Sequence, residues 1–412
     1  MELKQFQGFK YIDGGVCSAK GIKANGIFCG LGKNPNKNDL GMIFAESLCP
    51  AAAVYTQNKV KGAPIIVTQK NLADGYAQAV IVNSKNANTC NADGEQKAQL
   101  MCELTAKTVG IKASDVIVAS TGVIGQVLNI KPIEDNIQKL ADGLNENGSA
   151  ECATAIMTTD TFKKEVAVEF EIDGKACHLG GMAKGSGMIH PNMATTLNFI
   201  TTDVSISSEM LRLALGRVVK TTFNRLSIDG DTSTNDMVSI MATCMAKNNE
   251  ISQENDAYST FEKALYIVMM NLTRLLAKDG EGATKLLECT VNNAKTEEIA
   301  EIVAKSVITS SLFKSAMFGA DANWGRILCA IGYSNAEFDI TKVAVSISSR
   351  AGEIAVCENG AGIEFSESLA KTVLLEDEII ITIDLHDGNE KATAWGCDLT
   401  YDYVKINGDY RT

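Results

Sequence analysis

Four glycines close together constrain this chain more than any other feature of its sequence. They lie in the segment Leu179–Leu197, LGGMAKGSGMIHPNMATTL, which also holds a lysine, a proline and two adjacent threonines. Glycine accepts backbone angles that other residues resist, so this density predicts a tight path on which strain can be stored. A phosphate-binding loop would need GxxxxGKS/T or GxGxxG, and the segment has neither. A bland glycine-rich turn and a chemically special one both stay open.

The glycine-rich segment ends in two hydroxyl side chains, Thr195 and Thr196. A threonine hydroxyl is a weak nucleophile unless a base lies beside it. The chain holds only 3 histidines, namely His178, His190 and His386, which lowers the expectation of a histidine-based triad or metal site. The residues alone leave Thr195 and Thr196 as equal candidates for a nucleophile.

A second candidate is the loop Ala119–Gly125, ASTGVIG, which follows the apolar run Val116–Ser120. Loops at the ends of strands in α/β proteins often carry ligand-binding groups. The threonine and the glycine at the centre of this loop could present a hydroxyl and a backbone N–H to a developing oxyanion. An ordinary strand-to-helix turn is the competing interpretation.

Two polar segments stand out in the second half of the chain. Ser227–Asp236, SIDGDTSTND, carries three aspartates, but it lacks the closing glutamate of a calcium loop, so a polar turn is predicted. Lys314–Arg326, KSAMFGADANWGR, combines small residues with an aspartate and a tryptophan. This segment is expected either to pack near a pocket or to join two elements.

Composition restricts the class of protein. With 412 residues, of which 45% are hydrophobic and 21% charged, the chain is long enough for a large core in about two to three domains. A net charge of −12 argues against general nucleic-acid binding, because an acidic surface repels phosphate backbones. A local basic pocket for a small anion is compatible with that charge. No signal peptide and no membrane-spanning apolar run is visible in the sequence.

The 12 cysteines are scattered singly, without a CxxC pair. They are therefore expected to be reduced side chains rather than disulfides or zinc ligands. Together with the absence of a visible targeting segment, this pattern predicts a cytoplasmic protein that binds neither a membrane nor a metal.

Hydrophobic periodicity predicts an α/β or α+β fold, with mixed sheets and helices between the strands. Extended segments are expected at Ala79–Asn83, Val116–Ser120, Lys164–Phe170, Lys175–His178, Val343–Ile347, Glu353–Val356 and Ile379–Leu385. Helices are expected at Gly94–Val109, from Ser207 or Ser208 towards Phe223, along Phe261–Leu276 and from Glu297 to about Ser311. The pair Asp173-Gly174 predicts a tight hairpin turn. Only 5 prolines and no low-complexity linker argue against two flexibly joined modules.

Eight motifs spread over almost the whole chain resemble one family, the ornithine acetyltransferases of arginine biosynthesis. These enzymes are also called bifunctional glutamate N-acetyltransferase/amino-acid acetyltransferase. The motifs, in order, are GGVCSAKGIKANG, VNSKNANTCNADGEQ, ASTGVIGQ, AIMTTDTFKK, GGMAKGSGMIHPNMATTL, SIDGDTSTND, KSAMFGADANWGR and KINGDYRT. No single motif is decisive, but eight in the same order are highly specific.

The resemblance implies a self-cleaving N-terminal-nucleophile enzyme, related in fold to the DmpA-like aminopeptidases. The precursor would cut itself between Ala194 and Thr195, giving an alpha chain of residues 1–194 and a beta chain of residues 195–412. The family pattern Met-Ala-Thr, here ending at Thr195, selects it over Thr196. The fragments would stay together as a heterotetramer of two alpha and two beta chains.

The activity that the resemblance implies is acetyl transfer from N2-acetyl-L-ornithine to L-glutamate. Thr195 would carry the acetyl group between the two amino acids in a ping-pong reaction. The α-amine that cleavage frees on Thr195 has an ordinary pKa of about 7.7–8.0 and could act as the base. No cofactor and no metal is expected, and the resemblance leaves open whether acetyl-CoA is a second acetyl donor.

The resemblance also assigns residues to the site. Thr121 and Gly122 match the pair that stabilises the oxyanion. Substrate contacts are implied for Thr158, Lys184, Thr195, Glu281, Asn407 and Thr412. Lys184 suits a substrate carboxylate and Glu281 a substrate ammonium. The competing structural interpretations are a solvated Lys184, a Glu281 that only begins a helix after Gly280, and a disordered chain end.

Two other functions compete with acetyl transfer. The first is a self-cleaving aminopeptidase or amidohydrolase of related fold, in which water takes the acyl group. The second is a non-catalytic binding protein whose glycine-rich segment only holds a ligand. An intact chain in the purified wild-type protein would favour the second of these alternatives.

Overall fold

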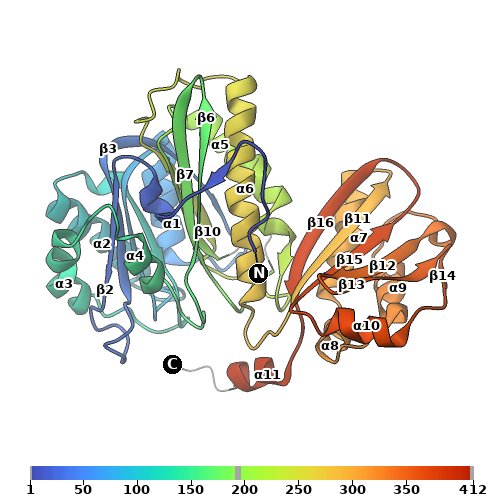
Figure 1. The fold of residues 1–412 in the computed structure, drawn as a ribbon. Coiled ribbons are helices and arrows are strands. Elements are labelled where there is room, and N and C mark those ends of the chain that lie inside the picture. The colour runs from blue at the N-terminus through green and yellow to red at the C-terminus, as the bar shows by residue number, and fades with distance from the viewer. Residues whose placement is uncertain (1, 191–195, 409–412) are drawn as a thin grey trace.

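Two β-sheets organise the chain in the computed structural model, which describes residues 2–190 and 196–408. The nine-stranded sheet forms the larger lobe, and the seven-stranded sheet forms the smaller one (Figure 1). The strands of the larger sheet are, in spatial order, β1 (Lys10–Tyr11), β6 (Lys164–Ile172), β7 (Lys175–Lys184), β8 (Leu197–Thr202), β10 (Met237–Ala242), β3 (Leu40–Tyr55), β4 (Tyr76–Asn83) and β5 (Val116–Ser120), with β2 (Ile22–Ile27) paired to β3.

The long strand β3 divides the larger sheet into two layers. Its first half pairs with β2 and β4, its second half pairs with β10, and the register with β4 shifts between Phe44 and Cys49. Both layers contribute side chains to one hydrophobic core, including Ile43, Val80 and Ile117 from one layer and Met182 and Phe199 from the other. The bend therefore lets a single sheet close over its own core.

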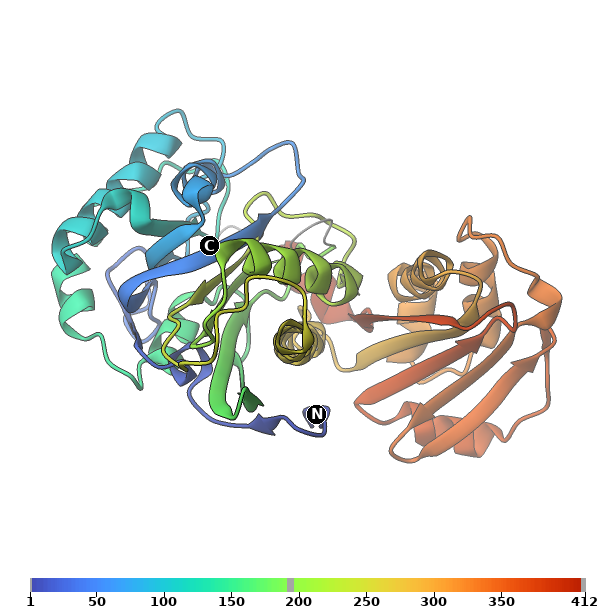
Figure 2. The ribbon, with the colours of Figure 1, turned by 90° about the horizontal axis from the view of Figure 1, so that it is seen from above.

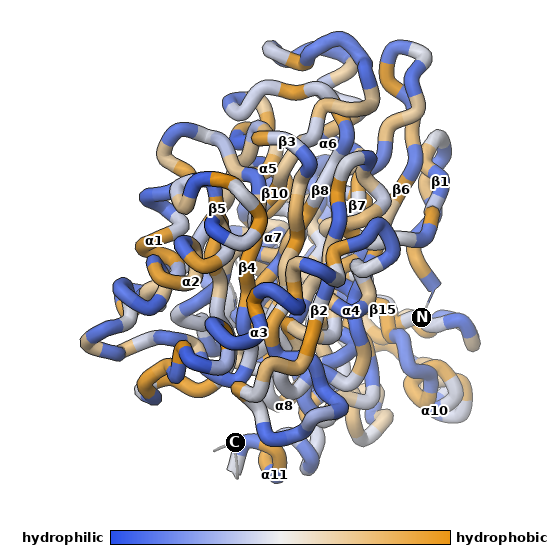
Figure 3. The backbone as a smooth tube through the Cα atoms, turned by 90° about the vertical axis from the view of Figure 1, so that its left-hand side faces the viewer, coloured by the Kyte–Doolittle hydropathy of each residue, from blue (hydrophilic) through white to orange (hydrophobic). Residues whose placement is uncertain are grey.

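Helices cover both outer faces of this double layer. On one side lie α1 (Ala63–Asn71), α2 (Gly94–Val109) and α3 (Lys131–Asp142), and α4 (Ser149–Ala155) packs on β2. On the other side lie α5 (Ser208–Thr221) and α6 (Asp256–Lys278). Strand β5 therefore has an apolar core on each of its faces. Val116 and Val118 face the core under α2, whereas Ile117 and Ala119 face the core between the layers. The strands are hydrophobic and many of the surrounding loops are hydrophilic (Figure 3).

The seven-stranded sheet lies beside α6, as the view from above shows (Figure 2). Its strands are, in order, β14 (Ala361–Gly362), β13 (Gly352–Glu358), β12 (Ala344–Ser349), β15 (Glu378–Asp384), β11 (Leu286–Ala294), β16 (Glu390–Cys397) and β9 (Leu226–Ser227). Its helices are α7 (Glu297–Thr309), α8 (Ser311–Phe318), α9 (Trp324–Gly332) and α10 (Glu367–Leu374). The last helix, α11 (Tyr401–Gly408), lies below the junction of the two lobes (Figure 1).

The predicted fold class and the predicted elements are confirmed, with one difference at a helix end. The β6–β7 hairpin turns at Asp173 and Gly174, which have φ values of 53° and 70°. The side chain of Ser207 caps α5 by accepting from the Met210 N–H. The helix predicted from Glu297 ends at Thr309, because the Ser310 side chain begins a second helix by accepting from the Phe313 N–H. Among the described residues, no helix has the length and apolar content of a membrane span.

The predicted cleavage point lies outside the described residues, and the boundary between residues 194 and 195 stays a prediction. Its surroundings are nevertheless defined. Strand β7 precedes it and strand β8 follows it, and these two strands pair with each other in antiparallel register. Strand β10, also beyond the boundary, pairs with β3. The predicted fragments would therefore share the larger sheet.

Candidate active site

A pocket of about 620 Å³ opens where the ends of β5 and β7 meet the connection from α6 to β11 and the helix α11. Six residues that the sequence analysis assigned to the site line it, although they are widely separated along the chain: Thr121, Gly122, Thr158, Lys184, Glu281 and Asn407. The remaining assigned residues, Ala194, Thr195 and Thr412, lie outside the described residues. Folding thus brings together the predicted positions that the structure describes.

The pair Thr121–Gly122 directly follows β5 and presents a hydroxyl to the pocket. The Thr121 N–H donates to the Asn83 carbonyl oxygen at 3.0 Å, so the side-chain hydroxyl is the donor that remains. The Lys184 ammonium donates to this hydroxyl oxygen at 3.1 Å, which leaves the hydroxyl proton for another acceptor. Gly122 has a φ of 129°, and a Cβ on it would lie 2.2 Å from the Lys85 carbonyl carbon. Glycine is therefore required at this position.

Lys184 is the last residue of β7 and is 8% exposed. The solvated-lysine interpretation is therefore wrong. Burial lowers the pKa of the Lys184 ammonium, and the nearby carboxylate of Asp160 opposes that shift. A cation in this position can meet a substrate carboxylate and can also orient the hydroxyl of Thr121.

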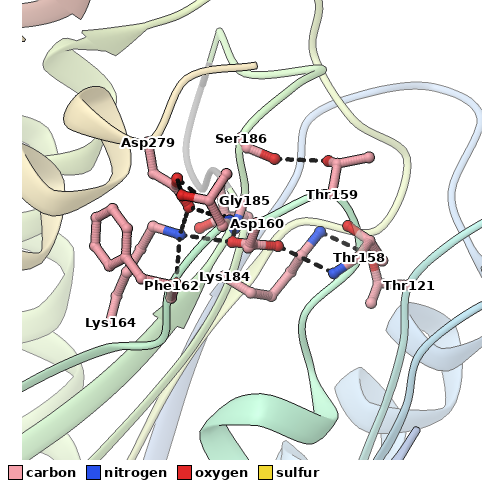
Figure 4. A network of polar contacts seen from close by, with 12 residues as sticks. Thr121, Thr158, Thr159, Asp160, Phe162, Lys164, Lys184, Gly185, Ser186 and Asp279 are labelled. Atoms are coloured by element: carbon pink, nitrogen blue, oxygen red, sulfur yellow. Dashed lines mark hydrogen bonds and ion pairs between the residues drawn. The ribbon is translucent and has the colours of Figure 1, made fainter. Parts of the chain in front are cut away.

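A buried charge network lies directly behind Lys184 (Figure 4). The Asp160 carboxylate accepts from the Lys164 ammonium and from the Gly185 N–H, both at 2.7 Å, and from the Thr158 N–H at 3.0 Å. Lys164 also donates to Asp279 at 2.5 Å. Burial by itself raises the pKa of Asp160, but the ammonium groups of Lys164 and Lys184 outweigh it and hold that pKa at about 2. The network fixes the end of β7, which lies within the glycine-rich segment.

This network was not predicted from the sequence. Its signal was the spacing of an aspartate and a lysine four positions apart in the motif AIMTTDTFKK. That spacing alone does not distinguish a buried pair from a solvated one, because the decisive third member, Asp279, comes from the end of α6.

The segment Ser227–Asp236 does more than the predicted polar turn. It links β9 to β10, and its residues Ser233, Thr234 and Asn235 line the pocket. The Asp229 carboxylate accepts from the N–H groups of Met188 and Ile189 at 2.6 and 2.8 Å. The segment therefore clamps the glycine-rich segment from outside. No pattern in the sequence pairs these two segments.

Thr196 is held firmly just after the predicted cleavage point. Its N–H donates to the Asp236 carboxylate at 2.7 Å, and its hydroxyl accepts from the Asn198 amide at 2.8 Å. Its φ is 74°, and a Cβ on Gly185 would lie 2.5 Å from its methyl carbon. Burial raises the pKa of Asp236 to about 7. The described residues Gly185 and Thr196, which lie before and after the predicted cut, therefore pack closely, as the glycine density predicted.

Glu281 lines the same pocket as the oxyanion pair and lies in the connection between α6 and β11. It does not begin a helix: its N–H donates to the Ser186 carbonyl oxygen at 2.8 Å. Its carboxylate accepts from the Asn407 amide at 2.8 Å, so α11 is pinned to the pocket. A Cβ on Gly187 would lie 2.2 Å from this carboxylate, which explains why a glycine faces it.

The segment Lys314–Arg326 connects α8 to α9, which is one of the two roles predicted for it. It spans the end of α8 and the start of α9. The buried Lys314 ammonium donates to the Ile228 carbonyl oxygen. Through this bond, the segment supports the base of the Ser227–Asp236 connection.

The fold and the pocket define an enzyme of the mixed α/β class whose site suits a small molecule with both an anionic and a cationic group. The model of the ArgJ family matches residues 23–412. The arginine biosynthesis bifunctional protein ArgJ of Caldanaerobacter subterraneus subsp. tengcongensis is 49% identical over 97% of this chain and 99% of its own length. ArgJ 1 of Clostridium acetobutylicum is 49% identical over 95% of this chain and 96% of its own. The chain therefore belongs to the ArgJ family.

Among solved structures, the ArgJ protein of Bacillus halodurans is 45% identical, with a TM-score of 0.49 over 52% of this chain and 98% of its own. Membership of the ArgJ family places this chain among the acyltransferases of arginine biosynthesis. The family and the enzyme class predicted from the sequence are thereby confirmed.

Proposed function

We propose that this enzyme transfers the acetyl group of N2-acetyl-L-ornithine to L-glutamate through an acetyl-enzyme on Thr195. The observation that carries the proposal is the arrangement of one pocket, where Lys184 and Glu281 face a cavity that also contains Thr121 and Gly122. The two charges suit an amino acid with an anionic and a cationic group. The hydroxyl and the glycine N–H suit an acyl group in reaction.

Each step uses groups that the pocket holds. The Glu281 carboxylate binds the substrate ammonium, and the Lys184 ammonium meets a substrate carboxylate with the donors that Thr121 does not use. The Thr195 hydroxyl attacks the acetyl carbonyl carbon, and its proton passes to the free α-amine of the same residue. The Thr121 hydroxyl and the Gly122 N–H stabilise the oxyanion. The C–N bond then breaks, and ornithine leaves with the proton that the α-amine holds. The amine of glutamate afterwards attacks the ester carbonyl carbon, takes the acetyl group and returns a proton through the α-amine to the Thr195 hydroxyl oxygen.

Self-cleavage between Ala194 and Thr195 creates that α-amine and divides the chain into residues 1–194 and 195–412. The fixed position of Thr196 against Asp236 supports this part of the proposal, because a held residue after the bond limits the geometries that the bond can take. The fragments assemble as two alpha and two beta chains in the cytoplasm. The chemistry requires no metal or other cofactor, acetyl-CoA is a second acetyl donor, and Thr412 contributes to substrate binding.

A transfer assay tests the proposal against hydrolysis by water. The purified enzyme is given N2-acetyl-L-ornithine with and without L-glutamate, and the products are separated. We expect N-acetylglutamate and ornithine in equal amounts when glutamate is present, and only a single turnover of ornithine without it. Continued release of acetate without formation of N-acetylglutamate would instead support the aminopeptidase or amidohydrolase alternative.

Replacing Thr121 by valine keeps the volume of the side chain and removes the hydroxyl. We expect kcat to fall by about 10²–10³, the typical loss for one oxyanion donor, with little change in KM. Steady-state kinetics of acetyl transfer check the result. Thr105→Val is the matched control, because it removes another buried threonine hydroxyl, one that donates within α2. An unchanged kcat in Thr121→Val would remove this residue from the oxyanion site.

A further inference from the structure

The proposed self-cleavage needs a base of its own. In acetyl transfer the free α-amine of Thr195 takes the hydroxyl proton, but before cleavage this nitrogen belongs to the peptide bond with Ala194. A peptide nitrogen is not basic, because resonance draws its lone pair into the carbonyl group. A threonine hydroxyl is a weak nucleophile unless a base lies beside it. The uncut chain must therefore supply a different group for this step.

A small cavity of about 270 Å³ lies beside Thr196, the residue that follows Thr195. Among the described residues of its wall, only Lys184 and Asp236 have charged side chains. The Lys184 ammonium donates to the Thr121 hydroxyl oxygen, and an ammonium group has no site that accepts a proton. Asp236 is thus the acid–base group that this part of the wall offers.

Two other titratable groups near the cut in sequence or space are engaged elsewhere. The ring of His190 lies beside the Ser227 hydroxyl, with 3.0 Å between Nδ1 and Oγ, and this histidine is not in the described wall of the small cavity or of the active-site pocket. The Glu281 carboxylate lines the active-site pocket and accepts from the Asn407 amide. Neither group contacts Thr196 as Asp236 does.

Asp236 is bonded directly to the backbone after the proposed cut. Its carboxylate accepts from the Thr196 N–H at 2.7 Å, and the Met237 N–H donates to the Thr196 carbonyl oxygen at 2.9 Å. The Thr56 N–H holds the Asp236 carbonyl oxygen at 2.9 Å. Covalent geometry alone keeps the Thr195 hydroxyl oxygen within about 5 Å of the Thr196 nitrogen. The hydroxyl can therefore meet the carboxylate by rotation about bonds of its own residue.

The surroundings of Asp236 suit proton transfer near neutral pH. Burial raises the pKa of its carboxyl group to about 7, against the opposing effects of the Thr196 N–H and of Lys184. Lys184, from β7, is the charged side chain that shares the described wall with it. The charge of Lys184 is met in turn by Asp160 and Glu281. A carboxyl group with a pKa close to the working pH can both take a proton and return it.

We propose that Asp236 is the base of self-cleavage, whose carboxylate takes the proton of the Thr195 hydroxyl and returns it to the departing nitrogen. The inference rests on the proposed self-cleavage and deepens it, because it names the group that starts the reaction. Once the bond is cut, the new α-amine is the base of acetyl transfer.

The cleavage balances with these groups and water. The Thr195 hydroxyl oxygen attacks the Ala194 carbonyl carbon, a C–O bond forms and the C–N bond breaks. The nitrogen takes the proton that Asp236 held and becomes the α-amine. Water then hydrolyses the ester, which gives Ala194 a free carboxyl group and restores the Thr195 hydroxyl.

Asp236→Asn separates a base from a group that only positions the backbone. The amide oxygen of asparagine still accepts from the Thr196 N–H, but it does not take up a proton. We expect the rate of cleavage to fall about 10²- to 10⁴-fold, the usual contribution of a general base. Precursor made in a short pulse of cell-free synthesis is followed by intact-mass measurement over time.

Asp203→Asn is the matched control for this variant. Asp203 is also a buried aspartate of the larger lobe, and its carboxylate accepts from a backbone N–H, that of His178, at 2.7 Å. The control should be cut at the wild-type rate.

The pH dependence of wild-type cleavage tests the inference on the native chain, so it does not depend on the folding of any variant. The rate should rise as the pH increases towards about 7, because the carboxylate is the basic form, and should level off above that value. Equal rates for Asp236→Asn and the wild type, or a wild-type rate that does not change across this range, would overturn the inference and leave Thr195 as the nucleophile. A wild-type chain that stays whole would instead overturn the proposed self-cleavage.

Discussion

Thr195→Ala is expected to remain a single uncut chain and to lose acetyl transfer, whereas the wild type separates into residues 1–194 and 195–412. The substitution removes the proposed nucleophile of both reactions, so kcat should fall on the order of 10⁶-fold, as nucleophile deletions do in other covalent enzymes. Intact-mass measurement reports the cleavage, and the transfer assay reports the catalysis. Thr195→Ser keeps the hydroxyl and should still cut itself.

The neighbouring threonine provides the matched control for this experiment. Thr196→Ala removes the hydroxyl that accepts from Asn198 but keeps the N–H that donates to Asp236, and it should still be cut at the same bond. A Thr195→Ala chain that splits there, or a Thr196→Ala chain that stays whole, would show that Thr195 is not the cleavage nucleophile.

Asp160→Asn is expected to destabilise the protein by about 3–5 kcal/mol, the usual consequence of removing one partner from a buried ion pair. The amide would leave Lys164 with one carboxylate instead of two and would face the buried Lys184 without a charge. Urea unfolding of the variant in the Thr195→Ala background, where only one chain unfolds, measures the difference. A drop in kcat is also expected, because the network holds the end of β7.

At acidic pH, the difference in the free energy of unfolding between Asp160→Asn and its parent should become smaller. The folded-state pKa of Asp160 is about 2, below the ordinary value of about 3.9, so its stabilisation is complete above the ordinary value and is lost as the pH falls through 2. Asp135→Asn is the control, since it breaks an exposed pair with Lys131 and should change the free energy of unfolding little. Equal effects of the two substitutions would show that the Asp160 network contributes no special stability.

Local pattern was enough to place α2 and β5. The helical spacing of apolar residues predicted α2. The apolar run Val116–Ser120 predicted β5, whose five residues are all buried. The long bent strand β3 had no such signal, since its exposed middle, Glu46–Leu48, interrupts the pattern. The split between α7 and α8 depends on one serine that caps the second helix rather than continuing the first.

The site was predictable by a different route. Lys184 and Glu281 came from the family resemblance, whereas the residues alone indicated a glycine-rich segment and, at Thr121 and Gly122, a loop that could stabilise an oxyanion. The groups that hold the site together were missed because each depends on a partner distant in the sequence. The Lys164 ammonium donates both to Asp160 and to Asp279, which is distant in the sequence. The pKa of Asp236 is raised by its burial in the folded chain.

The pairing of β7 with β8, and of β10 with β3, determines the order of folding and the proposed cleavage. Gly185 and Thr196, which lie before and after the proposed cut, contact Asp160 and Asp236 only after these strands have paired, so the proposed cleavage would follow folding. A cut chain is then evidence that the polypeptide reached its native arrangement at least once. Since the proposed mechanism has no step that re-forms the bond, unfolding after cleavage would release two chains that have to reassemble. The functional lifetime of the enzyme would then depend on its rate of unfolding.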